Sequence, residues 1–262
     1  MTSVLGRLTR PSLLPATGVA RTTALRLLVL VALVATWTLL SDDSVRVGLP
    51  SPARTWSSLV ALTESGELPR ALLESNVAMV LGYLLAVALG VPLGLLMGSF
   101  PIAGAVARPY LMLLLAIPLI AILPLVQAVL GLGLVTRVVV VVLFALVYIT
   151  LNTETGIRTV PSPLREMAHS YGASRWHTFR HVVLPSARPD IAAGLRLGLG
   201  RAVVGMVIAE LFLVTTGIGS VVSYYRGRFD TGAVLAIVLV LVLEGVLVMQ
   251  LTRRLDKRRG VQ

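Results

Sequence analysis

The chain has 262 residues, of which 56% are hydrophobic and 13% are charged, and its mean hydropathy is +0.89. Soluble domains carry about 25% charged residues, so this composition excludes an ordinary water-soluble domain. The formal net charge is +11, but the basic residues lie between apolar runs rather than on one face, which argues against a nucleic-acid interface. The chain has no cysteine, which excludes disulfides, thiol catalysis and cysteine metal sites. We therefore expect one integral membrane domain.

Several apolar stretches are long enough to cross the bilayer core, which takes about 20 helical residues. They predict an all-α fold with six transmembrane helices. The expected spans cover residues 23–40, 77–98, 109–130, 134–151, 191–213 and 233–251. We interpret the first as a retained span rather than a signal peptide, because a long segment precedes it and no small-x-small cleavage site follows clearly. Residues 1–22 would then form an N-terminal tail, and residues 152–190 a loop between the fourth and fifth spans.

The polar stretch after the first span contains a signal for a short helix. Ser51 can cap a helix and Pro52 suits its first position. Trp56 and Leu59 then belong to an apolar face suited to the membrane interface.

Glycines and prolines mark special positions in the second and third spans. Gly90, Gly94 and Gly98 recur every fourth residue, a pattern that lets another helix approach closely. Pro118 and Pro124 are expected to bend the third span, since each removes a helical hydrogen bond.

The distribution of Lys and Arg predicts the orientation. More of these residues lie in the N-terminal tail, the 152–190 loop and the C-terminal tail than in the intervening segments. By the positive-inside rule, both termini and the 152–190 loop face the cytoplasm.

Residues 165–185, "REMAHSYGASRWHTFRHVVLP", form a dense polar segment between apolar spans. Ser162-Pro163 can start a short helix, with Glu166 near its positive N-terminal end. Gly172 permits a sharp turn, and Ser174 can cap a second short helix that we expect to end at Leu184-Pro185. Exposed apolar residues on such a loop mark a partner site. The expected apolar residues are Leu164, Met167, Ala168, Tyr171, Trp176 and Phe179. The alternative is an amphipathic segment that lies on anionic lipid headgroups.

The same segment contains a spaced motif: Glu166-Met-Ala168, three residues, Gly172, nine residues, then Val-Val-Leu184-Pro185. It resembles the cytoplasmic loop signature EAA, x3, G, x9, I-x-LP of binding-protein-dependent ABC importer permeases. The segments "LPSP", "LGVPLGLLMG", "IPLIAILPL" and "AEL" followed by "GIG" are similar to one branch of that family, the permeases for nitrate, sulfonate and taurine.

The resemblance implies the type I ABC importer permease fold and a transport subunit rather than an enzyme. It implies that the loop docks on a separate ATPase subunit, which binds the ATP, so that the chain itself holds no cofactor. The implied coupling residues are Glu166, Ala168, Tyr171, Gly172, Trp176, Phe179, Leu184 and Pro185. The implied partners are two ATPase copies, an extracytoplasmic substrate-binding protein and a second permease copy in a bacterial inner membrane. The solute would be small, organic or inorganic, and would carry an anionic group, as sulfonates, nitrate and the zwitterion taurine do.

Charged residues within the expected spans are functional candidates, because burying a charge in lipid is costly. Glu210, near the outer end of the fifth span, could line the path or hold an outer gate; it could equally form a structural ion pair with an arginine or a hydrogen bond to the backbone across a helix interface. Glu244 in the sixth span is better explained by helix packing or a contact between two copies. Arg196 is expected to reach the cytoplasmic interface. Arg201 lies deeper and is a candidate for attracting an anion.

Three other functions have weaker support in the sequence. His177 and His181 lie four residues apart and could pair on a metal, but His169 lies beyond the glycine turn and no nearby carboxylate completes a site. A membrane-embedded hydrolase would need a histidine within the spans to activate Ser220 of "GIGS", and all three histidines lie in the loop. A secondary transporter driven by an ion gradient would bind no ATPase. The chain lacks the GxxxxGK[ST] loop that it would need to hydrolyse ATP alone.

Overall fold

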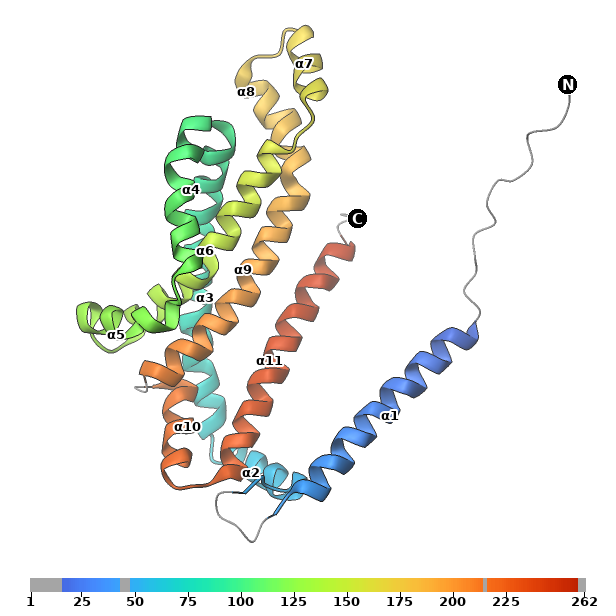
Figure 1. The fold of residues 1–262 in the computed structure, drawn as a ribbon, viewed down its shortest axis with the longest axis vertical. Coiled ribbons are helices and arrows are strands. Elements are labelled where there is room, and N and C mark those ends of the chain that lie inside the picture. Colours follow the sequence, from blue (N-terminus) through green and yellow to red (C-terminus); the bar gives the residue numbers. More distant parts are fainter. Residues whose placement is uncertain (1–15, 43–47, 214–215, 259–262) are drawn as a thin grey trace, which may run out of the picture.

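The computed structural model describes residues 16–42, 48–213 and 216–258, and these ranges are almost entirely helical (Figure 1). A π-helical turn at Phe179–Val183 separates the eighth helix from the ninth. In chain order the α-helices are α1 (Ala16–Leu40), α2 (Pro52–Glu64), α3 (Glu67–Ser99), α4 (Pro101–Ala116), α5 (Leu119–Leu130), α6 (Leu134–Arg158), α7 (Ser162–Ser170), α8 (Arg175–Thr178), α9 (Leu184–Leu213), α10 (Gly217–Gly227) and α11 (Thr231–Arg258).

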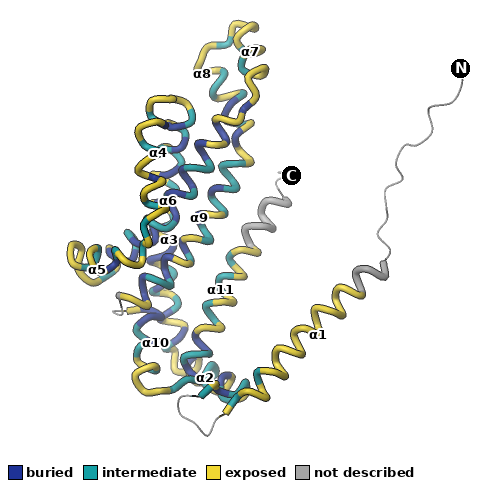
Figure 2. The backbone as a smooth tube through the Cα atoms, in the orientation of Figure 1, coloured by how far each residue is buried: buried dark blue, intermediate teal, exposed yellow. Residues whose placement is uncertain are grey.

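The helices have the length and surface of a membrane protein. Five of those described are long and apolar enough to cross a bilayer, and the bent pair α4–α5 makes six if it counts as one span. Large apolar side chains remain exposed on these helices. Figure 2 shows the exposed residues in yellow along the bundle and α1. Such a surface is unfavourable in water and suited to lipid or to other membrane subunits. The all-α membrane fold predicted from the sequence is confirmed.

Helices α3, α6 and α9 form the centre of the molecule, and α6 packs along both of the others. The core between them consists of small and medium apolar side chains: Met79, Ala86, Val141, Val142, Ala145, Ile149, Ala202 and Met206. Few of these side chains are long, so the helices can lie close together.

The glycines of α3 lie where α6 crosses it. A Cβ atom at Gly94 would lie 2.6 Å from the carbonyl oxygen of Thr150, and one at Gly90 would lie 3.1 Å from Ile149. Gly98 faces Ile157 of α6 in the same way. Each successive glycine therefore meets α6 about one turn further along, which is the arrangement that small residues at every fourth position permit.

The third predicted span is two helices rather than one. Helix α4 begins at Pro101 and ends at Ala116, and α5 leaves it at an angle of 101°. The break falls at Pro118, which precedes α5 and whose ring cannot donate a backbone hydrogen bond. Pro124 lies inside α5 and does not interrupt it. The two prolines that the sequence marked therefore differ: one divides the span and the other is accommodated in a short helix.

The helices that contain two other expected spans begin before the expected span boundaries. Helix α3 starts at Glu67 rather than near residue 77, directly after a left-handed turn at Gly66. Helix α9 starts at Leu184 rather than near residue 191, and it continues α8 through the π-helical turn. In both cases the additional residues are too polar to be included in a span predicted from hydropathy. They are nevertheless helical and extend the helix beyond the apolar run.

Helices α2 and α10 lie together at the end of the molecule opposite α7 and α8 (Figure 1). Leu62 of α2, Leu68 of α3, Ile218 of α10 and Ile237 of α11 pack in one buried cluster. Ser51 caps α2, since its Oγ accepts a hydrogen bond from the backbone N–H of Arg54 at 3.1 Å. The predicted start of this helix is confirmed.

Helix α1 lies apart from the bundle (Figure 1). Its packing contacts are with α2, and the indole nitrogen of Trp37 donates a hydrogen bond to the carbonyl of Pro50. None of its described membrane window is buried. Its apolar surface is therefore available to lipid or to another subunit.

Candidate functional site

The polar segment predicted to bind a partner forms a helical hairpin at one end of the molecule. Helix α7 begins at Ser162, and Glu166 lies beyond its first turn, which contains no acidic residue. The chain reverses at Gly172, whose φ of 76° is a left-handed conformation that side chains other than glycine rarely adopt. Ser174 then caps α8, because its Oγ accepts a hydrogen bond from the His177 N–H at 3.2 Å. The turn and the second cap agree with their predictions, whereas Glu166 is further from the helix start than expected.

The hairpin exposes a group of large side chains. Tyr171 is 86% exposed, Trp176 is 67% exposed and Met167 is 54% exposed. The rings of Trp176 and Phe179 stack with centroids 5.9 Å apart. Ala168 and Phe179 are half-buried, while Glu166 points to the surface. Aromatic and methionine side chains in one exposed region are typical of protein–protein interfaces.

The second helix of the hairpin does not end at Leu184-Pro185, contrary to the prediction. The N–H of Leu184 donates to the carbonyl of Phe179, five residues back, and α9 continues through Pro185 to Leu213. A π-helical turn widens the helix at the point where proline supplies no donor, so the chain can remain helical. The hairpin is consequently joined to a membrane span without a flexible connection.

A groove of about 630 Å³ separates the hairpin from the turn between α3 and α4. Phe100, Arg165, His169 and Trp176 are among its lining residues. Arg165 also donates to the carbonyl of Ile157 and so links α7 to the end of α6. The remaining two histidines, His177 and His181, stack on each other on the exposed side with ring centroids 4.1 Å apart. Among the residues that the structure describes, no three His, Asp or Glu side chains are close enough to hold a metal ion.

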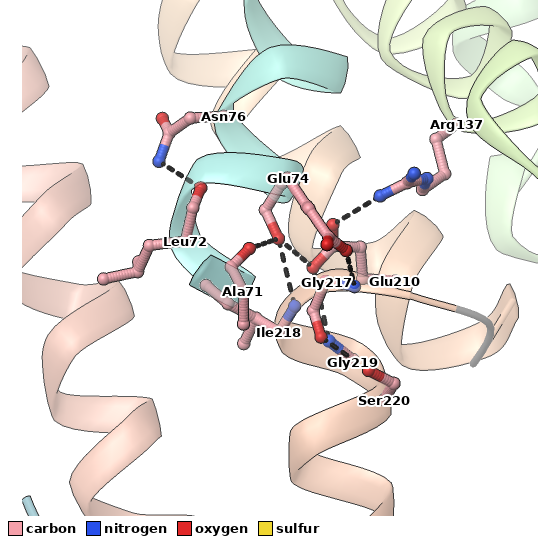
Figure 3. A network of polar contacts seen from close by, with 11 residues as sticks. Ala71, Leu72, Glu74, Asn76, Arg137, Glu210, Gly217, Ile218, Gly219 and Ser220 are labelled. Atoms are coloured by element: carbon pink, nitrogen blue, oxygen red, sulfur yellow. Dashed lines mark hydrogen bonds and ion pairs between the residues drawn. The ribbon is translucent and has the colours of Figure 1, made fainter. Parts of the chain in front are cut away.

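Glu210 lies at the centre of a buried polar network near the opposite end of the bundle (Figure 3). Its carboxylate is 3.3 Å from Nη1 of Arg137 and accepts a 2.6 Å hydrogen bond from Ser75 Oγ. It also accepts a hydrogen bond from the N–H of Gly219. The network therefore joins α3, α6, α9 and α10. Glu210 forms both the ion pair with an arginine and the hydrogen bond to the backbone of another helix that were expected as its structural roles.

The segment that enters α10 is fitted closely around this network. Gly217 has a φ of 70°, and a Cβ atom there would lie 2.6 Å from both Glu210 Oε1 and Ser75 Oγ. Its N–H donates to Glu74, and the next N–H, that of Ile218, donates to Ser75. The first turn of α10 thus has its free amide groups satisfied by side chains of α3 and α9.

Arg201 and Pro118 line a hollow of about 210 Å³ where α4 bends into α5. The guanidinium of Arg201 lies 4.5 Å from the ring centroid of Tyr148 on α6, a cation–π contact. Pro124 is exposed on α5 and does not line this hollow. Two of the predicted pathway residues therefore meet in one place, while Glu210 and Pro124 lie elsewhere.

Glu244 lies on α11 and is half-buried. Its Oε2 atom is buried and has no hydrogen-bond partner among the described residues. It contributes to neither the hollow nor the network around Glu210.

The ion-pair partners of the buried charges could not be identified from the sequence. Arg137 lies near the start of the fourth expected span and is buried against Glu210. Glu154 was not identified, yet it is buried and forms ion pairs with Arg108 of α4 and Arg158 of its own helix. A charged residue inside an apolar run was the available signal for Arg137, whereas Glu154 lay beyond the expected end of its span.

Comparison with known proteins identifies the same kind of subunit. Residues 90–261 match the family described as "binding-protein-dependent transport system inner membrane component". The riboflavin transport system permease protein RibX of Chloroflexus aurantiacus is 40% identical over 116 residues, which are 44% of this chain and 43% of that protein. The putative aliphatic sulfonates transport permease SsuC of Bacillus subtilis is 32% identical over 80% of this chain and 76% of its own length. The taurine transport system permease TauC of Escherichia coli is 29% identical over 80% of this chain and 78% of its own length.

Solved structures share the fold. A chain of the MetNI methionine ABC transporter in an inward-facing conformation superposes with a TM-score of 0.58 at 18% identity, over 73% of this chain and 94% of that chain. The likeness supports the helical arrangement described above. Membership of this family implies an ATPase partner and a substrate-binding protein. The chain, a multi-pass membrane protein and a transport subunit rather than an enzyme, belongs to the binding-protein-dependent transport system inner membrane components, the permeases of ABC importers.

Proposed function

We propose that two copies of this chain form the translocation path of an ATP-driven importer for a small organic or inorganic solute that carries an anionic group. Two ATPase subunits bind the α7–α8 hairpins, and a substrate-binding protein delivers the solute from outside. The permease chain itself binds no cofactor, and ATP is bound and hydrolysed by the partner. The assembly lies in a bacterial inner membrane with both termini in the cytoplasm.

The observation that carries this proposal is the rigid connection between the exposed hairpin and α9. A force on Trp176 passes through an unbroken helical path to Arg201 and Glu210, since α8, the π-helical turn and α9 follow without a coil. Closure of the ATPase subunits would therefore move a membrane span directly. Alternating access requires such a coupling between the motor and the spans.

A second copy is proposed because one chain leaves its path open. The hollow at the α4–α5 bend is lined by residues of α4, α5, α6 and α9 and is open to the surroundings of the chain. Arg201 is exposed there. A charged side chain exposed to lipid at this depth would be costly. A second permease covering this face would replace lipid with protein and water.

The test is to purify the tagged chain from its own membrane and to measure uptake by the reconstituted complex. An ATPase subunit is expected to co-purify in a ratio of one per permease chain. Proteoliposomes supplied with the binding protein are expected to take up a solute from a panel of radiolabelled taurine, ethanesulfonate and nitrate only when ATP is present. Absence of any ATPase, or uptake that follows an ion gradient without ATP, would contradict the proposal.

A further inference from the structure

Arg201 is a charged side chain whose surroundings within the chain do not neutralise it. Among the described residues no carboxylate forms an ion pair with Arg201. Its guanidinium carbon lies over the Tyr148 ring, 4.5 Å from the ring centroid. Arg137, by comparison, is buried in an ion pair with Glu210. Arg137 and Arg201 are therefore held differently, and of these two it is Arg201 whose charge has no carboxylate partner among the described residues.

Arg201 lies in the interior of α9, far from both ends of that helix. It lies roughly 25 Å along α9 from Leu184 and roughly 18 Å before Leu213, at about 1.5 Å per residue. Both distances exceed the reach of an arginine side chain, and the hydrocarbon core is about 30 Å thick. An arginine at such a depth faces a water-filled cavity or a partner rather than lipid.

The hollow beside Arg201 has the form of a small binding site. It measures about 210 Å³, and its described lining is apolar except for Tyr148 and Arg201. The bend at Pro118 opens it, because α5 turns away from the bundle at 101°. Apolar walls around a single charge reduce the screening by water and strengthen its attraction for an anion.

We propose that Arg201, held against the face of Tyr148, binds the carboxylate or sulfonate group of the transported solute in this hollow. The planar guanidinium can donate two parallel hydrogen bonds to two oxygens of either group. Stacking on Tyr148 orients that plane and reduces the entropy lost on binding. The apolar lining from Leu115 to Ile120 would contact the remainder of a small organic anion. This site rests on the proposed function, since it lies on the proposed path.

The absence of cysteine from the whole chain allows a direct test of the charge preference. Leu115 lines the hollow and is 42% exposed, so Leu115→Cys places one thiol beside Arg201. The complex in lipid nanodiscs is treated with an anionic reagent, 2-sulfonatoethyl methanethiosulfonate, or a cationic one, 2-(trimethylammonio)ethyl methanethiosulfonate. Each rate is divided by the rate for free N-acetylcysteine. The anionic reagent is expected to react at least about tenfold faster than the cationic one.

Companion variants assign the preference to Arg201. Arg201→Gln should bring the two normalised rates to within about twofold of each other, while Arg201→Lys keeps the charge and should keep most of the preference. Tyr148→Leu should reduce the preference without abolishing it. Arg196→Gln, the same substitution on the same helix outside the hollow, should leave the preference unchanged. Ile120→Cys, across the bend, provides a second reporter should Leu115→Cys fail to fold.

The possible results separate this site from the importer itself. Equal rates with Arg201 present, no reaction with either reagent, a preference that survives Arg201→Gln or one lost in Arg196→Gln would each overturn the assignment. Labelling needs neither ATP nor the binding protein. Failure of the charge preference would therefore remove the anion site and leave ATP-driven import standing, whereas uptake without ATP would contradict the importer and leave the labelling result unaffected.

Discussion

Gly172 and Glu210 illustrate how differently single residues act in this chain. Gly172 acts through its own backbone, because its left-handed φ turns the chain between α7 and α8 and no neighbouring atom lies within 4 Å of a Cβ placed there. Glu210 acts through four separate helices that meet at its carboxylate. A substitution at Gly172 should therefore have a local effect on the hairpin, whereas one at Glu210 should affect the stability of the whole bundle.

Gly172→Val should uncouple the permease from its ATPase. A β-branched residue in the left-handed region costs roughly 1–2 kcal/mol, which displaces α8 and the exposed Trp176 relative to α7. Uptake per ATP hydrolysed should fall at least about fivefold, while the purified chain remains monodisperse. The transport stoichiometry in proteoliposomes measures this.

Gly172→Asn is the matched control for that substitution, since asparagine adopts the left-handed conformation more readily. It should keep most of the coupling. Equal loss in both variants would mean that the backbone conformation is not the reason for glycine here.

A second change, Glu166→Lys, reverses an exposed charge on α7 and should weaken ATPase binding without altering the spans.

Breaking the Arg137–Glu210 pair should destabilise the bundle strongly. Arg137→Met leaves a buried carboxylate without its counter-charge, which costs about 3–5 kcal/mol when one partner of a buried pair is removed. Equilibrium unfolding in mixed micelles measures the change in free energy.

The double variant Arg137→Met with Glu210→Gln should recover more than half of that loss. Glutamine carries no charge and its carbonyl oxygen can still accept the hydrogen bonds from Ser75 and Gly219. A double variant as unstable as Arg137→Met alone would contradict a role based on charge pairing.

At the scale of elements, the close contact between α3 and α6 requires glycine at Gly94, since glycine has no Cβ atom. Gly94→Ala should be strongly destabilising, because its Cβ would lie 2.6 Å from a backbone carbonyl of α6 that cannot move independently of its helix. The separation of the two helices would have to increase along their shared length. A lower midpoint of thermal unfolding in detergent, together with reduced yield, is the expected result.

Gly245→Ala is the matched control, being the same substitution in the interior of α11. Its Cβ would lie 3.8 Å from Val203, an ordinary contact, so the variant should be at least as stable as the parent chain. Equal destabilisation by the two substitutions would show that helix packing at Gly94 is not specific.

Some helix boundaries could be predicted from the sequence and others could not, depending on whether local or distant contacts set them. The start of α2 and the cap of α8 depend on one side chain bonding to a nearby N–H, which is a local property of Ser51 and Ser174. The break at Pro118 was also local, but its angle was not, since the direction of α5 depends on packing against α6 and α9. The continuation of α8 into α9 was missed because a π-helical turn has no distinctive sequence pattern.

At the scale of the whole molecule, the proposed orientation can be tested with two equivalent serines. Ser57 of α2 and Ser170 of α7 are both exposed, and each hydroxyl donates to a carbonyl of its own helix. In intact cells, a membrane-impermeant maleimide should label Ser57→Cys and should label Ser170→Cys only after the membrane is permeabilised. The opposite pattern would reverse the orientation and separate the hairpin from a cytoplasmic ATPase.

The sequence by itself determined the class of the molecule and the form of its hairpin. Hydropathy and the Lys and Arg distribution are properties of single segments, and they sufficed to predict an α-helical membrane protein with a polar loop. The spacing from Glu166 through Gly172 to Pro185 resembles the loop signature of ABC importer permeases, and that resemblance predicted a permease with a partner-binding loop. Only the tertiary structure decided which charges are paired. Arg137 and Glu210 are separated by 73 residues, and Arg201 meets Tyr148 and the bend at Pro118 only after three helices have packed. The energy of an ionic group in a membrane depends on what surrounds it in space, and the order of residues along the chain does not specify those neighbours.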